Sequence, residues 1–137
     1  MAAFSVLVDT DVFIEFFNFG RLAFLFRSPE FRVYYSIVTK KELLSKQGLR
    51  ESERHAIVQE LRRHRLIRLT EPITRRYSML RAAYPSLQKE DALIAASALA
   101  KKLPLVTKNK KHFDENMKAA EVELTGSVVQ ELDNLFQ

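Results

Sequence analysis

The stretch from Phe4 to Phe17 constrains the fold most, because a strand and a helix meet in it around two carboxylates. Its first residues, FSVLV, form a short apolar and partly β-branched run that is typical of a buried strand. After the Asp-Thr-Asp break, apolar residues recur at helical spacing. Asp9 and Asp11 therefore lie where a strand ends and a helix begins. Either one can simply cap the helix, but ligands of parallel sheets also bind beyond the carboxyl ends of the strands.

The alternation of strand and helix continues along the chain. The sequence predicts further strands at 33–38, 66–69, 103–106 and 121–124, and helices at 52–64, 70–84, 87–102 and 127–136. Strands that alternate with helices form a mostly parallel sheet with helices on both faces. We therefore predict an α/β fold, a three-layer α/β/α sandwich, and the 137 residues suit a single domain, 1–137.

Two more acids occupy similar places. Glu42 follows the predicted strand 33–38, where Thr39 and Glu42 match a capping box, so capping and catalysis both remain open for Glu42. Asp91 lies near the start of an Ala-rich helix, where the helix dipole stabilises a carboxylate whether or not it serves a site. Thr107 and Asn109 follow the strand 103–106 and add groups that suit an anion or a metal at the same edge.

Composition narrows the class of protein. The chain has no cysteine, which excludes disulfides and Cys-based zinc sites, and its three histidines lack metal-ligand spacing. No apolar run is long enough to span a membrane and no signal peptide precedes the first strand, so we expect a cytoplasmic protein. The net charge of +5 favours an anionic partner. Basic residues concentrate at 40–68 and 101–118, on either side of acids, which suits a phosphate backbone approaching a bound metal, although solvated helix faces explain much of such charge.

Phenylalanine is concentrated near the amino terminus. Of the ten phenylalanines, eight lie between positions 4 and 31. One small core has difficulty burying so many rings. We therefore expect the helices between Val12 and Arg27 to contribute to an interface with a second copy of the chain or with a partner protein, with core packing as the alternative.

The segments LVDTDVFIEFF, SIVTKKELL and EDALIAASALAKKLPLVTKNKKHF resemble, in order and spacing, the PIN-domain family, and in particular its VapC-type toxins. The resemblance implies a compact α/β/α fold and a Mg²⁺- or Mn²⁺-dependent endoribonuclease that is homodimeric and neutralised by an antitoxin protein. It assigns Asp9, Glu42 and Asp91 as the catalytic, metal-binding acids.

Other residues receive auxiliary roles. Asp11 supports the acidic site, and the hydroxyl groups of Thr10 and Thr107 can position water or phosphate, although local capping explains both threonines equally well. Asn109 stands near the position where many PIN domains have a fourth acid, so a fourth acidic ligand is in doubt. We expect three lysines to bind RNA: Lys108, Lys110 and Lys111.

Two other functions remain open. Asp9-Thr10-Asp11 matches the start of the haloacid-dehalogenase signature, with Asp9 as nucleophile, but Phe13 replaces the Thr or Val of that signature. A non-catalytic module that keeps the fold and binds protein or RNA is the second alternative, because a fold does not fix a function.

Overall fold

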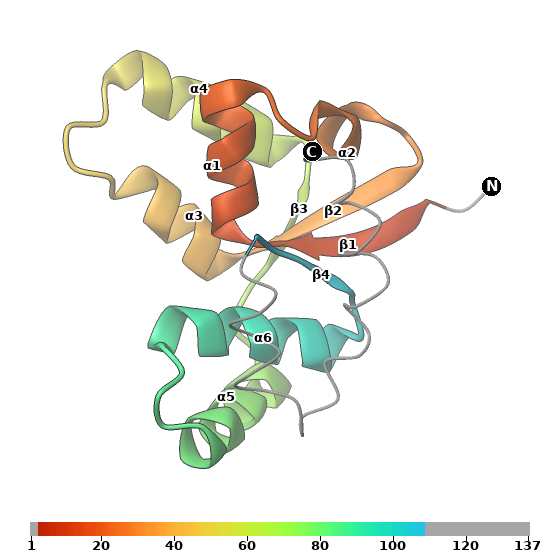
Figure 1. The fold of residues 1–137 in the computed structure, drawn as a ribbon, viewed down its shortest axis with the longest axis vertical. Coiled ribbons are helices and arrows are strands. Elements are labelled where there is room, and N and C mark those ends of the chain that lie inside the picture. The colour runs from red at the N-terminus through yellow and green to blue at the C-terminus, as the bar shows by residue number, and fades with distance from the viewer. Residues whose placement is uncertain (1–2, 109–137) are drawn as a thin grey trace.

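The computed structural model describes residues 3–108, and these form a parallel sheet between two layers of helices (Figure 1). The strand order is β3-β2-β1-β4, and every pairing is parallel. The strands are β1 Phe4–Val8, β2 Phe31–Ser36, β3 Arg65–Ile67 and β4 Leu105–Val106. The α/β/α prediction is confirmed. The predicted elements at 121–124 and 127–136 lie outside the described residues.

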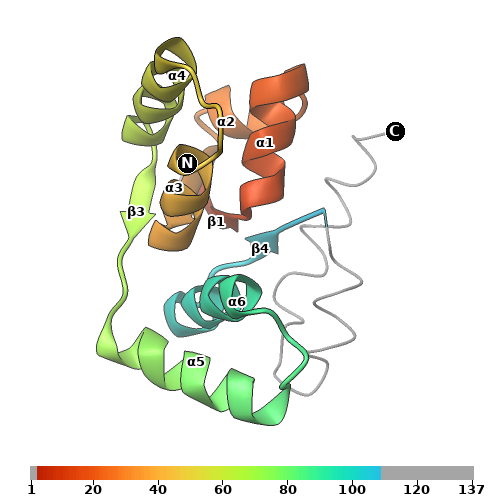
Figure 2. The same cartoon turned by 90° about the vertical axis from the view of Figure 1, so that its left-hand side faces the viewer.

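Helices cover the two faces of the sheet unequally (Figures 1 and 2). One face carries α1 Thr10–Phe19, α2 Ala23–Arg27, α3 Ile37–Leu44 and α4 Glu51–Arg62. The other carries α5 Glu71–Ala83 and α6 Lys89–Lys101. Each layer has its own core, and β1 contributes to both because its side chains alternate: Val6 and Val8 join the core under α1, and Leu7 joins the core under α6.

The local sequence explains where α1 begins and ends. Asp9 is its N-cap, and the Asp9 carboxylate accepts a hydrogen bond from the Thr10 backbone N–H at 2.8 Å. Gly20 ends the helix with φ of 68°, a left-handed conformation in which glycine avoids the steric cost of a side chain. The first loop of the chain thus fixes Asp9 at the end of β1.

The start of α3 differs from the prediction. We expected strand 33–38 and a Thr39 cap, but the strand ends at Ser36, whose hydroxyl accepts a hydrogen bond from the Val38 backbone N–H at 3.1 Å. An earlier start of the helix places Val38 and Thr39 in the buried interior. The capping-box interpretation of Glu42 is therefore wrong, because Glu42 is not at the third helical position of α3.

Smaller differences affect other boundaries. The helix predicted from Ser52 is capped instead by Arg50, whose backbone N–H and side-chain Nε–H both donate to the Glu53 carboxylate, at 3.2 and 2.9 Å. Thr70 is the N-cap of α5, as predicted. The predicted strands 66–69 and 103–106 shorten to β3 and β4.

The phenylalanine-rich segment divides between core and surface. Phe13 and Phe26 are buried with their ring centroids 5.0 Å apart, and Phe16 stacks on Phe26 at 4.3 Å. Phe19 is 65% exposed and Phe4 is 47% exposed. Core packing thus accounts for part of the phenylalanine enrichment between positions 4 and 31. The exposed rings are not explained by the core, and an interface formed by them remains a prediction.

Among residues 3–108, the helices are all too short or too polar to cross a membrane.

Phe13 tests the core beneath α1. We expect Phe13→Ala to lower the free energy of unfolding by about 3–5 kcal/mol, because a fully buried ring is lost. Phe19→Ala, on the same helix, removes a mostly exposed ring and should change it by less than about 0.5 kcal/mol. Urea denaturation measures both. Equal losses would contradict the packing described for α1.

Candidate active site

Asp9 lies at the centre of the carboxyl edge of the sheet, and neighbouring strands hold it there. Its backbone N–H donates to the Val106 carbonyl at 2.9 Å, which extends the β1–β4 pairing by one residue. Its side chain accepts from the Thr10 N–H at 2.8 Å and from the Thr107 hydroxyl at 2.7 Å. Asp9 is only 4% exposed, so the structure fixes both the place and the orientation of its carboxylate.

Two threonine hydroxyl groups, of Thr10 and Thr39, form a short hydrogen-bond chain that ends at Glu42. The Thr10 hydroxyl donates to a Glu42 carboxylate oxygen at 2.8 Å and lies 2.8 Å from the Thr39 hydroxyl. Thr10 has one hydroxyl proton and gives it to Glu42, so Thr39 donates to Thr10. Glu42 is therefore oriented by α1 as well as by its own helix α3.

Further acids act on this pair through their charges. Burial raises the pKa of the Asp9 carboxyl from its ordinary 3.8 to about 6, and the charges of Asp11 and Asp91 add to the rise against the hydrogen bonds from Thr107 and Thr10. Burial also raises the pKa of Glu42, with contributions from the charges of Glu90, Asp11 and Asp91. The three predicted acids therefore lie at one edge of the sheet and interact electrostatically.

The donor set fits a hard divalent cation in charge and in chemistry. Within the described residues, the hydrogen bonds to Asp9 and Glu42 come from neutral N–H and O–H groups, so no basic side chain neutralises these two acids. Carboxylate oxygens are the ligands that Mg²⁺ prefers, and Mg²⁺ usually keeps several waters. In the arrangement described for residues 3–108, no three Asp, Glu, His or Cys side chains are spaced to hold one ion.

The structure locates only part of the predicted auxiliary set. Thr10 and Thr107 both contact site carboxylates, as described above. Lys108, expected to bind RNA, donates to Glu15 of α1, which also accepts from Arg21 at 2.8 Å. Asp11 lies in the first turn of α1, and its charge acts on Asp9 and Glu42. The other three residues of that set lie outside the described part of the chain: Asn109, Lys110 and Lys111.

Sequence reasoning missed three contributors to this edge. Thr39 was read as a cap but is buried and hydrogen-bonded to Thr10. Glu90 raises the pKa of Glu42, and its position directly before Asp91 was an available signal. Glu15 pairs with Lys108 across 93 residues of sequence, which no local pattern reveals.

An apolar groove of about 430 Å³ opens beside Glu42, between α1, α3 and α4. Ile14 and Phe17 of α1 line one side, and Leu43 and Ile57 line the other. Ile14 is 41% exposed. The groove therefore offers partly exposed apolar surface within reach of the acidic edge.

The parallel sheet between two helical layers, with acids at its carboxyl edge and neutral donors holding them, defines an α/β protein with a cation-attracting site. The PIN domain model matches residues 6–118. The chain belongs to the PIN-domain family. The haloacid-dehalogenase alternative therefore loses its support.

Known proteins share this sequence and fold. Ribonuclease VapC1 of Methanocaldococcus jannaschii is 30% identical over 115 residues, which cover 80% of this chain and 79% of that protein. A toxin–antitoxin complex from Klebsiella pneumoniae contains a chain with 28% identity and a TM-score of 0.65, with 79% of this chain and 89% of that chain covered. VapBC2 from Rickettsia felis, bound to a promoter DNA fragment, gives a TM-score of 0.70 at 22% identity, with 81% and 92% covered, and supports the fold.

The Asp9→Asn variant tests whether the buried Asp9 carboxylate destabilises the folded protein when it is ionised. Because the folded protein binds the Asp9 proton more tightly than the unfolded chain, Asp9 favours folding less as pH rises from about 4 to about 6. At about 1.4 kcal/mol per pKa unit, the wild type without metal should be less stable than Asp9→Asn by up to about 3 kcal/mol at pH 8. The difference should shrink towards pH 4.

Urea denaturation in EDTA at pH 4 and pH 8 measures this. The variant keeps an acceptor for the Thr10 N–H, and its amide can donate to the Thr107 hydroxyl. Added Mg²⁺ should stabilise the wild type at pH 8 more than Asp9→Asn, since binding to the folded state raises stability. If the difference in the free energy of unfolding between the wild type and Asp9→Asn is the same at pH 4 and pH 8, the raised pKa of Asp9 is contradicted.

Proposed function

We propose that this chain is a Mg²⁺- or Mn²⁺-dependent endoribonuclease and the toxin of a toxin–antitoxin pair. The observation that carries the proposal is the buried, hydroxyl-anchored Asp9 at the acidic carboxyl edge of a PIN domain. The 30% identity to a ribonuclease of the same family supports RNA as substrate. A metal-dependent hydrolase of phosphodiester bonds holds its cation at such an acidic edge.

In this proposal Asp9, Glu42 and Asp91 hold the metal ion, with Asp11 as an auxiliary acid, and the three carboxylates move closer together on binding than they lie in the described arrangement. The bound ion would activate water and stabilise the charge that develops on the scissile phosphate. The chain's own residues position the ligands: Thr107 fixes one Asp9 oxygen and Thr10 fixes one Glu42 oxygen. Asp9 is almost completely buried, so little water surrounds its carboxylate. A charge in such a low-dielectric environment attracts a cation more strongly than an exposed one does.

An antitoxin protein is the proposed partner. Two of the solved structures with this fold are complexes of a toxin with its antitoxin or of VapBC type, which supports the same kind of partner here. The groove lined by Ile14, Phe17, Leu43 and Ile57 suits the apolar face of a helix. A segment seated there would lie beside Glu42 and could block access to the acidic edge.

A homodimer is the second proposed assembly. Phe4 and Phe19 are large exposed apolar side chains on the phenylalanine-rich segment, and such rings are enriched at interfaces. Sedimentation of the purified chain would decide between a dimer and a monomer.

Glu42→Gln tests the catalytic assignment most sharply. Glu42 does not cap α3, and Gln keeps an oxygen that can accept from Thr10, so the fold should persist. Loss of the charge should reduce metal-dependent RNA cleavage by on the order of 100-fold, most strongly at low Mg²⁺. Asp9→Asn should abolish cleavage for the same reason.

Cleavage of a fluorescent single-stranded RNA against Mg²⁺ concentration measures the effect, with thermal melting as the check on folding. Glu30→Gln removes an exposed carboxylate outside the site and is the matched control. If Glu42→Gln melts normally and cleaves at the wild-type rate, Glu42 is not a ligand. If the wild type cleaves no RNA with any divalent metal, the non-catalytic module is the better description.

Ile14→Arg tests the antitoxin groove. A charge at this partly exposed position should prevent an apolar helix from seating. Because Glu42 lines the same groove, binding is measured without metal or RNA, so that any effect of the new charge on the acids does not enter the result. Met79→Arg, at a 65% exposed apolar position on α5, is the control. Co-purification with the product of the neighbouring gene measures binding. Equal retention by both variants would place the partner elsewhere.

A further inference from the structure

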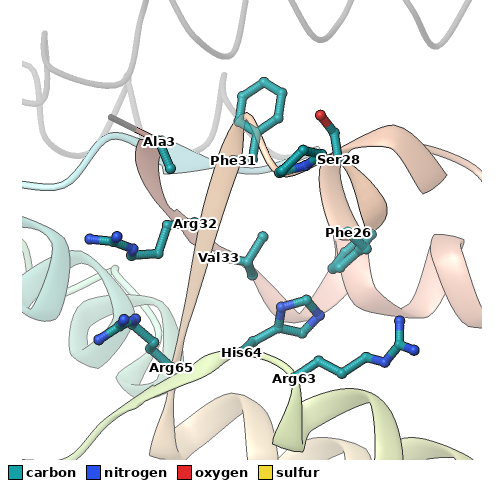
Figure 3. Close-up of a pocket in the computed structure, with 10 residues that line it drawn as sticks. Ala3, Phe26, Ser28, Phe31, Arg32, Val33, Arg63, His64 and Arg65 are labelled. Atoms are coloured by element: carbon teal, nitrogen blue, oxygen red, sulfur yellow. The ribbon is translucent and has the colours of Figure 1, made fainter. Parts of the chain in front are cut away.

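A second hollow lies at the opposite edge of the sheet from the acids. Its volume is about 410 Å³, and it opens where β2 and β3 begin, near Ala3 at the start of β1 (Figure 3). Arg32, Arg63 and Arg65 line it together with Phe26, Phe31 and Ser28. Since β1, β2 and β3 are parallel, this is the amino edge, whereas Asp9 follows the carboxyl end of β1.

The three guanidinium groups of this hollow have no acidic partner in the described part of the chain. Arg32, Arg63 and Arg65 are exposed, and none forms an ion pair within residues 3–108. Glu60 is close in sequence, but Arg27 binds it at 2.7 Å and His64 at 2.6 Å. Arg32 and Arg65 extend to the same side of the hollow and Arg63 extends to the other (Figure 3), and like charges near one another without a counter-ion attract an anion.

The positive surface continues along the edge strand. The pairing of Tyr34 with Arg65 places Arg32 and Arg65 on the same face of the sheet, two residues apart in register. Directly after β3, Arg68 lines another hollow of about 380 Å³ together with Lys101 at the end of α6. Five basic residues thus lie along β3 between the amino edge and the carboxyl edge of the sheet. We call them the basic track: Arg32, Arg63, Arg65, Arg68 and Lys101.

Protection of an open sheet edge explains only part of this track. Charged side chains on an edge strand prevent pairing with another sheet, and β3 is an edge strand, so Arg65 has such a role. Arg32 lies on β2, where it pairs with Ser5 of β1, two residues before the pairing with β3 begins at Tyr34. A single charge is enough to protect so short an open stretch, and Arg65 and Arg63 lie beside it in the same hollow.

We propose that the basic track binds a single RNA strand away from the point of cleavage, and that the arginine hollow holds its far end. This rests on the proposed ribonuclease function and extends it to how the substrate is held. Arginine forks bind phosphate oxygens in pairs, and Phe31 and Tyr34, which line the two hollows, offer aromatic surface for bases. An acidic peptide could form ion pairs with the arginines, but it has no bases that would stack on Phe31 and Tyr34.

The direction of the track supports the assignment. Arg63 precedes β3 and Arg68 follows it, so the track spans about 17 Å of extended chain and ends at the same edge as Glu42 and Asp9. A strand bound along β3 would therefore lead from the arginine hollow to the acidic edge. Because the side chains that hydrogen-bond to Asp9 and Glu42 within residues 3–108 are threonines and not these basic residues, binding and cleavage can be tested separately.

Arg32→Gln and Arg65→Gln test the track, with Arg76→Gln as the matched control. Arg76 is likewise exposed, lies on α5 and lines neither hollow. In EDTA, a fluorescein-labelled single-stranded 12-nucleotide RNA should bind each test variant on the order of fivefold more weakly, with its salt dependence reduced by about 0.7 in slope. With Mg²⁺, KM for the same RNA should rise at unchanged kcat, and a tetranucleotide should be cleaved as by the wild type.

The two arms separate this proposal from the ribonuclease function. If the test variants bind the 12-nucleotide RNA as tightly as Arg76→Gln does, the track is overturned whether or not the protein cleaves RNA. If the variants lose binding and no metal supports cleavage, the track stands and the nuclease function fails. If hexaglutamate binds more tightly than the RNA and loses affinity in the same variants, the hollow takes an acidic protein segment and the proposal is overturned.

Discussion

The hydrogen bond from Thr107 to Asp9 is the contact on which the candidate site most depends. It joins residues 98 apart in sequence at 2.7 Å, and the Asp9 backbone N–H is paired to the neighbouring strand at 2.9 Å. Asp9 thus retains a buried carboxylate whose pKa is raised to about 6 by burial and neighbouring acids. Burial of an unneutralised carboxylate opposes folding, and carboxyl groups with pKa values shifted in this way cluster at functional sites.

The parallel sheet separates charge between its two edges. Acids collect at the carboxyl edge because loops from β1 and β2 lead into α1 and α3 there, and α6 begins nearby with Glu90 and Asp91. Arginines collect at the amino edge, where β2 and β3 begin. A polyanionic substrate would meet attraction at one edge and would need a cation at the other. The same topology therefore supplies both the proposed cleavage site and the proposed binding track.

Family membership and local geometry support the function at different levels. The match over residues 6–118 establishes the PIN domain. The geometry adds that Glu42 is oriented by Thr10 rather than used as a helix cap, which frees its charge for a ligand role. It also adds that Lys108 is bound by Glu15, whereas Arg32, Arg63 and Arg65 have no acidic partner within residues 3–108, which favours these arginines over Lys108 in the proposed binding of RNA.

The sequence by itself determined the α/β/α fold and the edge on which the acids lie. Alternating apolar runs and helical spacing fix which segments become strands and helices, and polar groups after parallel strands must share one edge. Only the tertiary structure decided that Ser36, not Thr39, begins α3, because burial of Val38 and the contact of Thr39 with Thr10 favour the earlier start. Only the tertiary structure assembled the arginine hollow, since Arg32 and Arg65 become neighbours through strand register, which no local pattern in the chain specifies.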